Sequence, residues 1–476
     1  MKQAGHRWLE AARSAAVTAA LLLAACAQFP TRPPIGPITD IPASVAAPAT
    51  TALSATYAAE SVRRDTAMRV WKLIDERFYD PKFNGVDWER ARRQFVPRAE
   101  AARSDAEFYA ALKAMVRSLH DSHTQVLTAR ETVDRRRFVS PRMGLHLGWI
   151  EQQVAIIEVE PESPAALAGL RAGDVIRAVN GTRLDAGFFR RARSTSTLAD
   201  AEAADAPFDG FSEARPTGAD GERERVLRAV AREVRGAAGS PPHLSPVRFM
   251  VERDGGSIAE ATVAATLAPR PPSAEFRMLD GGVALIRFSR FLPEVRYAVE
   301  RALQDARFAR AVIIDLRGNG GGLFEFYRWF AGRFLPESRE VMRSLRRESG
   351  TTEQGSGVVR AGGVGPPLLQ PLAVLVDSRT ASAAELTAVT LAEQRDALLV
   401  GDPTCGCVVG VRAEYVLPDG GGLRVSETGF VSARGAHMEG RPTMPAVRVV
   451  PTLADLRAGR DVVLEEAQRR LLRGLH

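Results

Sequence analysis

Residues 371–410 read PLAVLVDSRTASAAELTAVTLAEQRDALLVGDPTCGCVVG, and this stretch decides the fold of the C-terminal half of the chain. The apolar run at 372–376 predicts a strand covered on both faces, because branched residues without polar alternation need burial on each side. A polar turn follows, and the sequence predicts a helix beginning near Ser382. The first N–H groups of a helix have no intrahelical partners and can stabilise an anion. Ser382 is therefore a candidate nucleophile.

The same residues allow an alternative without chemistry. Ser382 and Glu385 are three residues apart and fit a capping box, in which each side chain bonds the other's backbone N–H group. A nucleophile also needs a base, a group that orients the base, and donors for the developing oxyanion. The rest of the chain must supply all three.

Composition limits the classes of protein that the chain can belong to. Its 476 residues, 45% of them hydrophobic, suffice for about three domains of roughly 150 residues each. The 64 basic and 57 acidic residues are interleaved, without a clustered aromatic and basic face, which argues against a nucleic-acid partner. The chain has only four lysines, Lys2, Lys72, Lys82 and Lys113.

The first residues predict export. Basic residues precede an apolar segment at 15–25, which is too short to span a bilayer and is typical of a signal peptide. It ends Leu-Ala-Ala-Cys at Cys26, which resembles the lipidation site of bacterial lipoproteins; an ordinary signal peptide is the alternative. We expect a lipoprotein signal peptide at 1–26 and a Pro/Ala-rich tether at 27–59. By the same resemblance, Ala27 favours the periplasmic face of the outer membrane.

Cys405 and Cys407 are then the remaining cysteines, in a compartment that permits disulfides. Two cysteines cannot form a disulfide scaffold, and a structural zinc ion prefers four ligands. We therefore expect no metal.

Three regions follow the tether. Helical periodicity predicts a small helical domain at 60–140. The run SPAALAGLRAGDVIRAVNG at 163–181 resembles a PDZ domain, which we place at 141–270 with a polar surface insertion at about 186–246. PDZ domains hold a peptide's C-terminal carboxylate on backbone N–H groups, here those of Gly144 and Leu145 by resemblance. His146 faces either the peptide or solvent.

Strands and helices alternate from 271 to 476, which predicts an α/β domain with a parallel sheet and functional loops at its C-terminal strand ends. One such loop, Arg-Gly-Asn-Gly-Gly-Gly at 317–322, can turn its N–H groups into an anion-binding nest. Beside Ser382, it would complete an oxyanion hole with the N–H of Ala383. A tight turn is the alternative.

Several segments together resemble one family of enzymes: FYDPKFNGVDW, LHDSHT, the PDZ run, VIIDLRGNGGG, DSRTASAAE, VGDPTCG and MEGRPTMPAV. They occur in the order seen in the C-terminal processing (tail-specific) serine peptidases and the related tricorn core peptidases. The resemblance covers about residue 60 to the end. It implies a ClpP/crotonase-like α/β peptidase domain that needs no cofactor or metal. It also implies Ser382 as nucleophile, with Ala383 and Gly321 as oxyanion donors.

One departure concerns the base. Resemblance to the processing peptidases implies a Ser-Lys dyad, in which the lysine lies 25 residues after the serine. In this chain Cys407 stands at that position. A thiol is a poor base, and a thiolate would repel the alkoxide. The tricorn-like pattern instead offers His123 as base, with Ser122 and Glu439 as polar support. A purely structural His123 is the alternative, and His120 is a weaker candidate.

The sequence thus predicts a serine endopeptidase of the bacterial cell envelope, anchored by lipid at Cys26, that recognises protein or peptide substrates by their C-termini. Because the lysine is missing, the main alternative is an inactive PDZ scaffold that binds envelope proteins. A peptidase that clips small peptides is a third possibility.

Overall fold

A parallel sheet is the centre of the C-terminal region. The computed structural model describes residues 60–136, 140–194, 219–240, 243–268, 272–347, 354–363 and 365–474. All belong to one compact unit, Tyr57–His476, and the expected signal peptide and tether lie outside the described residues. The six strands of the sheet are, in spatial order, β12 (Ala274–Leu279), β13 (Val283–Phe288), β14 (Ala311–Asp315), β17 (Leu372–Val376), β18 (Leu398–Gly401) and β21 (Val447–Arg448). Five run parallel, and β12 pairs antiparallel with β13.

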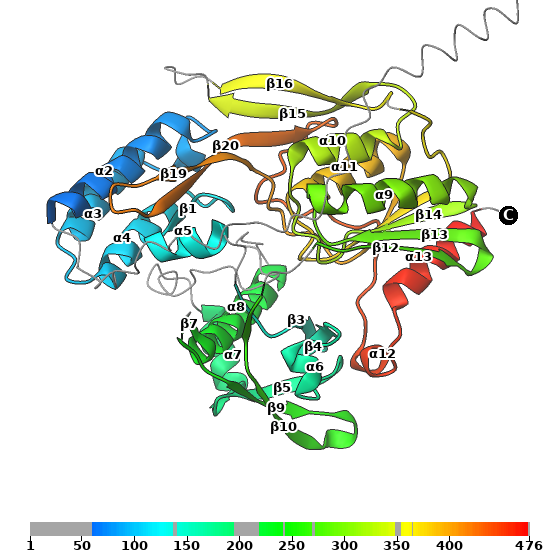
Figure 1. Ribbon diagram of the computed structural model, residues 1–476, viewed down its shortest axis with the longest axis horizontal. Coiled ribbons are helices and arrows are strands. Elements are labelled where there is room, and N and C mark those ends of the chain that lie inside the picture. The colour runs from blue at the N-terminus through cyan, green and yellow to red at the C-terminus, as the bar shows by residue number, and fades with distance from the viewer. Residues whose placement is uncertain are drawn as a thin grey trace, which may run out of the picture. The chain divides into compact units, whose positions relative to one another are not determined.

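Helices cover both faces of this sheet, as the alternating pattern predicts (Figure 1). One core includes side chains of α9 (Pro293–Asp305), α10 (Phe324–Gly332) and α11 (Ala383–Arg395). The opposite face packs against α13 (Val462–Arg473), which the sequence did not reveal. Every residue of β17 is buried, so its apolar run reflects cover on two sides. The predicted α/β class is confirmed.

The helical region forms a second core. Its three main helices are α2 (Glu60–Arg77), α3 (Trp88–Glu100) and α4 (Asp105–Arg117), each capped or charged at its start as expected. Asp87 and Ser104 accept hydrogen bonds from the first turns of α3 and α4. A short strand, β1 (Gln125–Leu127), and the helix α5 (Ala129–Arg136) follow.

A second, antiparallel sheet connects the helical region to the parallel one. Strand β1 pairs with β20 (Gly422–Ser432), which also pairs with β15 (Arg339–Arg347) and β19 (Gly410–Val416); β16 (Gln354–Ala361) pairs with β15. Periodicity did not predict this sheet, because β15 and β19 place charged residues among few apolar ones. Its consequence is that residues near 125 lie beside residues near 424.

The PDZ-like region is a six-stranded sheet with a helix packed on it. The strands are β3 (Leu145–Ile150), β4 (Gln153–Val159), β5 (Val175–Val179), β6 (Thr182–Arg183), β9 (Val247–Glu252) and β10 (Ile258–Val263), with β3 at one edge. The short helix α6 (Pro164–Leu167) begins at the predicted Ser163 cap, and α12 (Leu453–Arg457) packs from the C-terminal region through Leu453.

The predicted surface insertion at 186–246 needs correction. Within it lie α7 (Ala186–Ser194) and α8 (Ala219–Ala238), and α8 buries Val226, Val230 and Val234 in the same core as β3, β5 and β9. Helix α8 is therefore an integral part of the PDZ-like fold. Its amphipathic spacing was visible in the sequence, but the polar residues around it concealed the role. Residues 195–218 lie outside the described residues.

The minor elements complete the described chain: β2 (Ser140–Arg142), β7 (Gly239–Ser240), β8 (His243–Leu244) and β11 (Thr266–Ala268). Within the described ranges, no helix combines the length and apolar character needed to cross a membrane.

Candidate active site

Ser382 lies in a strained turn between β17 and α11. Its φ of 55° and ψ of −122° are sparsely populated for a residue with a side chain, so the surroundings must hold it there. In the described structure its side chain makes no capping hydrogen bond to α11, so the capping-box alternative does not hold for the serine. The hydroxyl is consequently free of local capping at the start of a buried helix. We call residues 380–383 the elbow.

The glycine loop lies directly against the elbow. Gly321 has φ 82°, and a Cβ atom there would come within 2.7 Å of the Ser382 Cβ and 2.8 Å of the Ala383 nitrogen. The loop is tied to the elbow by Ala381, whose N–H donates to the Asn319 carbonyl at 3.0 Å. The predicted proximity of Gly321, Ser382 and Ala383 is therefore present.

The assignment of Gly321 as a donor meets one complication. Its N–H donates to the Asn319 Oδ1 at 2.9 Å, and the Asn319 Nδ2 donates to the Phe288 carbonyl at 2.8 Å. Asn319 is fully buried and fixes the loop. For Gly321 to bind an oxyanion, its N–H must leave the Asn319 Oδ1 or donate to both oxygens at once.

A third segment, residues 404–408, touches both the elbow and the start of α11; we call it the bridging loop. The Ser382 N–H donates to the Cys407 carbonyl at 2.9 Å, and the Cys405 N–H donates to the Thr380 carbonyl at 3.0 Å. Cys405 and Cys407 form a disulfide, a pairing that the sequence left open. Cys407 occupies the lysine's place, but as a disulfide it cannot act as a base.

Glu385 ties the bridging loop to α11. This carboxylate is fully buried and accepts from the N–H groups of Gly406 and Cys407, both at 2.8 Å, and from the Thr404 hydroxyl. Burial raises the pKa of Glu385 to about 7, although these hydrogen bonds act to lower it. Glu385 therefore serves the loop rather than a capping box with the Ser382 hydroxyl.

The lysines of the described chain lie in the helical region. Lys113 lies in α4 and pairs with Glu131 at 3.2 Å, and Lys72 and Lys82 belong to the same region. No lysine of the described residues therefore belongs to the parallel-sheet region that carries Ser382.

Residues 120–124, the base arm, reach the site from the helical region. Glu439 joins the arm to the bridging loop, because its Oε1 accepts from the Ser122 N–H and its Oε2 from the Val408 N–H, both at 2.7 Å. The His123 Nδ1 lies 2.6 Å from the Ser122 Oγ, which is in turn hydrogen-bonded to Glu439. The three predicted residues His123, Ser122 and Glu439 form one connected relay.

The relay has unusual electrostatics. Burial, together with the positive charges of Arg424 and Arg135, lowers the pKa of His123 to about 3. Burial, and then the negative charge of Asp121, raise the pKa of Glu439 to about 7, against the effect of its hydrogen bonds. The imidazole is therefore neutral near pH 7, and a pKa this low makes it a weak base in the protein without substrate.

Sequence reasoning missed the residues that hold the base arm. Asp121 Oδ1 accepts from the N–H groups of His123 at 2.8 Å and Thr124 at 2.7 Å, and from the Ser426 hydroxyl at 3.0 Å. Burial raises the pKa of Asp121. The Asp-Ser-His-Thr context contained this signal, since an aspartate often bonds the backbone two residues on. Nothing local pointed to Ser426 of β20.

Residues Gly144 to His146 of the PDZ-like region have close internal contacts. Gly144 has φ 74°, and a Cβ there would lie 2.1 Å from the Ser163 Cβ, so only glycine fits. His146 is buried, with its Nε2 3.3 Å from the Glu160 Oε1. The His146 side chain therefore contacts Glu160 inside the protein, whereas the sequence suggested contact with either a peptide or solvent. Cys26 lies outside the described residues.

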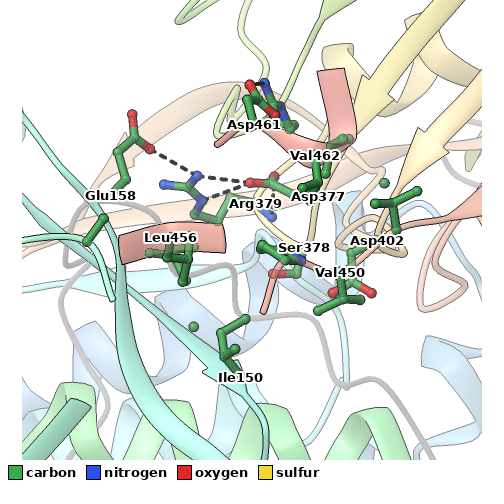
Figure 2. Close-up of a pocket in the computed structure, with 18 of the residues that line it drawn as sticks. Ile150, Glu158, Asp377, Ser378, Arg379, Asp402, Val450, Leu456, Asp461 and Val462 are labelled. Carbon is green, nitrogen blue, oxygen red and sulfur yellow. Dashed lines mark hydrogen bonds and ion pairs between the residues drawn. The ribbon is translucent and has the colours of Figure 1, made fainter. Parts of the chain in front are cut away.

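A pocket of about 410 Å³ separates the PDZ-like strands from the ends of the parallel strands. Figure 2 shows Arg379 between Glu158 and Asp377, with Ser378 and Asp402 on the same wall. The Arg379 Nη2 lies 3.3 Å from Glu158 and 2.9 Å from Asp377. The elbow side of the sheet and β4 are therefore joined by an ion-pair network.

Among the described residues, Glu385, Cys405 and Cys407 place three possible metal-ligand atoms within 4.8 Å of one another. The disulfide occupies both sulfur atoms, and the carboxylate already accepts hydrogen bonds. In this form the cluster does not offer the thiolates that a soft metal ion needs.

The protein has a serine elbow, a glycine loop against it and a PDZ-like sheet. These features together are those of a serine peptidase that contains a PDZ domain. Family models match in the same order: the Tricorn protease C1 domain at residues 68–117, the PDZ domain at 156–200 and Peptidase family S41 at 282–449. Residues 282–449 thus match peptidase family S41, and the sequence-based recognition of a C-terminal processing peptidase with a PDZ domain is confirmed.

Relatives agree with this assignment. The chloroplastic C-terminal processing peptidase of Tetradesmus obliquus is 25% identical over 397 residues, covering 81% of this chain and 76% of its own length. The carboxyl-terminal-processing protease of Picosynechococcus sp. is 27% identical over 381 residues, covering 76% and 77%. The solved structure of the photosystem II D1 C-terminal processing protease shares the fold at 22% identity, with a TM-score of 0.53 over 86% of this chain and 97% of that one.

Proposed function

We propose that the chain is an active endopeptidase in which Ser382 is the nucleophile and His123 the base. The observation that carries this proposal is the unbroken connection from Ser382 through the Cys407 carbonyl, the adjacent Val408 N–H and Glu439 to Ser122 and His123. This network supports the assignment of His123, because it links the arm that carries the histidine to the loop that holds the Ser382 N–H.

In the first step, His123 takes the Ser382 proton while the serine oxygen attacks the peptide carbonyl, and His123 later returns the proton to the leaving amine. The relay fixes which ring nitrogen does this. With Nδ1 bonded to Ser122, Nε2 remains for the proton, and Glu439 supports the positive charge through Ser122.

The oxyanion is bound by the Ala383 N–H at the start of α11 and by the Gly321 N–H, which gives up Asn319 when substrate arrives. An acyl-enzyme on Ser382 follows, and water releases it. Neither step calls for a cofactor or a metal ion.

Substrates are recognised by their C-termini in the PDZ-like region, with the carboxylate on the N–H groups of Gly144 and Leu145. Gly144→Ala should raise KM for a protein with a free C-terminus and leave kcat unchanged. Gly181→Ala is the matched control, because Gly181 also has positive φ (89°) but an added Cβ would meet nothing within 4 Å. Equal effects of both substitutions would contradict C-terminal recognition by this loop.

The place of action that fits the N-terminal sequence is the cell envelope. Lipidation of Cys26 would anchor the enzyme by the tether at 27–59, at the periplasmic face of the outer membrane. Metabolic labelling with a fatty-acid analogue, compared between wild type and Cys26→Ser, tests this. Labelling that persists in Cys26→Ser would exclude Cys26 as the site.

The central test uses protein from residue 27 onward, a fluorophosphonate probe and an unstructured protein substrate. Wild type should label and cleave, Ser382→Ala should do neither, and His123→Ala should lose about 10²–10⁴-fold in kcat. Wild type that neither labels nor cleaves would favour the PDZ scaffold. Normal cleavage by His123→Ala would exclude His123 as base.

A further inference from the structure

The bridging loop carries three separate supports of the peptidase centre within five residues. Its Cys407 carbonyl holds the Ser382 N–H at 2.9 Å, its Gly406 and Cys407 N–H groups hold Glu385, and its Val408 N–H holds Glu439. The elbow, the first turn of α11 and the base relay therefore all depend on the position of this one loop.

The strain of the elbow makes this dependence important. Ser382 occupies a sparsely populated backbone conformation that persists only where neighbours enforce it. One enforcing contact is the Cys407 carbonyl, and another is the Cys405 N–H on the Thr380 carbonyl. Both belong to residues of the disulfide.

The disulfide also fills the space behind the elbow. Cys405 and Cys407 form a buried cluster with Ala381, the residue before the nucleophile, and their exposed fractions are 5% and 1%. Two thiols cannot stay at bonding distance, so breaking the bond must move at least one side chain in this closely packed cluster. The movement is transmitted to Ala381 or to the Cys407 carbonyl.

We propose that the Cys405–Cys407 disulfide is a positioning element of the catalytic centre, which holds the elbow in its reactive conformation and makes turnover sensitive to thiol reductants. This inference rests on the proposed peptidase function. A dithiol attacks one sulfur to form a mixed disulfide, and its second thiolate then displaces the protein thiol. Two electrons and two protons end on Cys405 and Cys407, and the reductant leaves as a cyclic disulfide.

The experiment compares oxidised and dithiothreitol-reduced wild type, with reduction verified by mass after alkylation of two thiols. Reduction should lower kcat by roughly 10²-fold, as expected for a displacement of about 1 Å at a catalytic group. KM should stay constant, because the carboxylate loop at Gly144 is elsewhere, and oxidised glutathione should restore kcat. A role in stability alone would not give this split between kcat and KM.

The double variant Cys405→Ser/Cys407→Ser should match the reduced wild type and should not respond to dithiothreitol. Reduced wild type provides the same loss of the cross-link if the variant does not fold. Full activity after verified reduction would overturn the proposal, and so would purified, air-exposed protein in which both thiols alkylate without prior reduction.

Hydrogen exchange separates this proposal from the peptidase function. If Ser382 labels in neither redox state, the peptidase function fails, and amide exchange then decides alone. Reduction should speed exchange at Ser382 and Cys405–Cys407, whose N–H groups bond the Cys407 carbonyl, the Thr380 carbonyl and Glu385. Unchanged exchange in an inactive, verified dithiol form would overturn the inference.

Discussion

The elbow and the base arm are held by contacts of very different range. The elbow is fixed by the glycine loop and the bridging loop, which follow strands of the same parallel sheet. The base arm is fixed by Ser426 and Glu439, which lie 302 residues from Thr124 and 317 residues from Ser122. The nucleophile's geometry is thus part of the sheet, whereas the base's position depends on how the helical region docks on β20.

The strongest way to break the elbow is Gly321→Ala. The new methyl group would meet Ser382 and Ala383 at 2.7 and 2.8 Å and would block the oxyanion position. We expect kcat to fall roughly 10³-fold, the upper range for loss of an oxyanion donor. Steady-state kinetics on the unstructured substrate measures this.

Gly435→Ala is the matched control, because its φ is 88° and an added Cβ would meet nothing within 4 Å. Gly435→Ala should lose about 1 kcal/mol of unfolding free energy through backbone strain alone, and Gly321→Ala should lose more because its methyl group also clashes with the elbow. If Gly435→Ala lost as much activity as Gly321→Ala, general destabilisation would explain the result, and the contact with Ser382 would not.

The difference in range also explains what could be predicted from sequence. The strands at 283–288, 372–376 and 175–179 are apolar runs with clear turns, and the structure has them at those bounds. The positive φ of Ser382 left no local trace, because a serine there looks like any helix cap. The pairings of β20 with β1 and β15, and with them the position of Ser426, join distant segments that no local pattern encodes.

The same reasoning applies to the site. His123, Ser122 and Glu439 came from motifs that resemble a family, and the structure joins them in one relay. Asp121 and Asn319 lie within the segments LHDSHT and VIIDLRGNGGG, yet their roles depend on buried hydrogen bonds. The interpretation of 186–246 as an insertion failed for α8, because its apolar stripe matters only beside β3 and β9.

Glu439 is where the elbow side and the base arm meet, and it predicts the pH dependence. Its pKa is about 7, while that of His123 is about 3, so within the relay the Glu439 carboxylate changes charge near neutrality, as Glu385 does beside the bridging loop. We expect kcat to rise as pH increases through about 7, because the charged form best accepts both N–H groups and supports the imidazolium. Glu439→Gln should lower kcat roughly 10²-fold and abolish this limb.

The free energy of unfolding should fall as pH increases through about 7, whereas kcat should rise. The folded pKa of Glu439 is raised from 4.5 to about 7, so the folded protein keeps a proton that the unfolded chain has lost in this window. This contribution to unfolding free energy is fully present below pH 4.5 and is lost as pH rises through about 7. Denaturant titrations at pH 5 and 8 should show a smaller loss in Glu439→Gln than in wild type. If kcat of Glu439→Gln still rose through about pH 7, the titration would belong to another group.

A smaller effect should come from Ser426→Ala, which removes one hydroxyl from Asp121 and Thr124 without touching the elbow. We expect kcat to fall about fivefold, corresponding to about 1 kcal/mol, while fluorophosphonate labelling of Ser382 slows in parallel. Ser344→Ala is the control, since Ser344 is also buried in the same sheet, at 9% exposure against 0% for Ser426, and its hydroxyl donates to the Gly357 carbonyl at 3.3 Å. Equal losses of activity would show that the arm has no special dependence on Ser426.

The smallest effect is expected at the outer side of the elbow, where Glu158 of β4 pairs with Arg379. Burial acts to raise the pKa of Glu158, but Arg379, His146 and Arg287 outweigh it and lower the pKa to about 2. The pair is still partly exposed, and Arg379 keeps Asp377 as a second partner at 2.9 Å. Glu158→Gln should therefore cost at most about 0.5 kcal/mol, similar to Glu275→Gln in an exposed pair with Arg277.

The kinetic result of Glu158→Gln sharpens the comparison further. If the elbow is held by its own sheet, kcat on a short peptide without a recognised C-terminus should remain within about twofold of wild type. A much larger loss would mean that Ser382 also relies on β4 through Arg379 and Asp377. The elbow would then depend on docking of the PDZ-like region, as the base arm depends on docking at β20. The elbow and the base arm would differ in the region that holds each of them, and both would rely on long-range contacts.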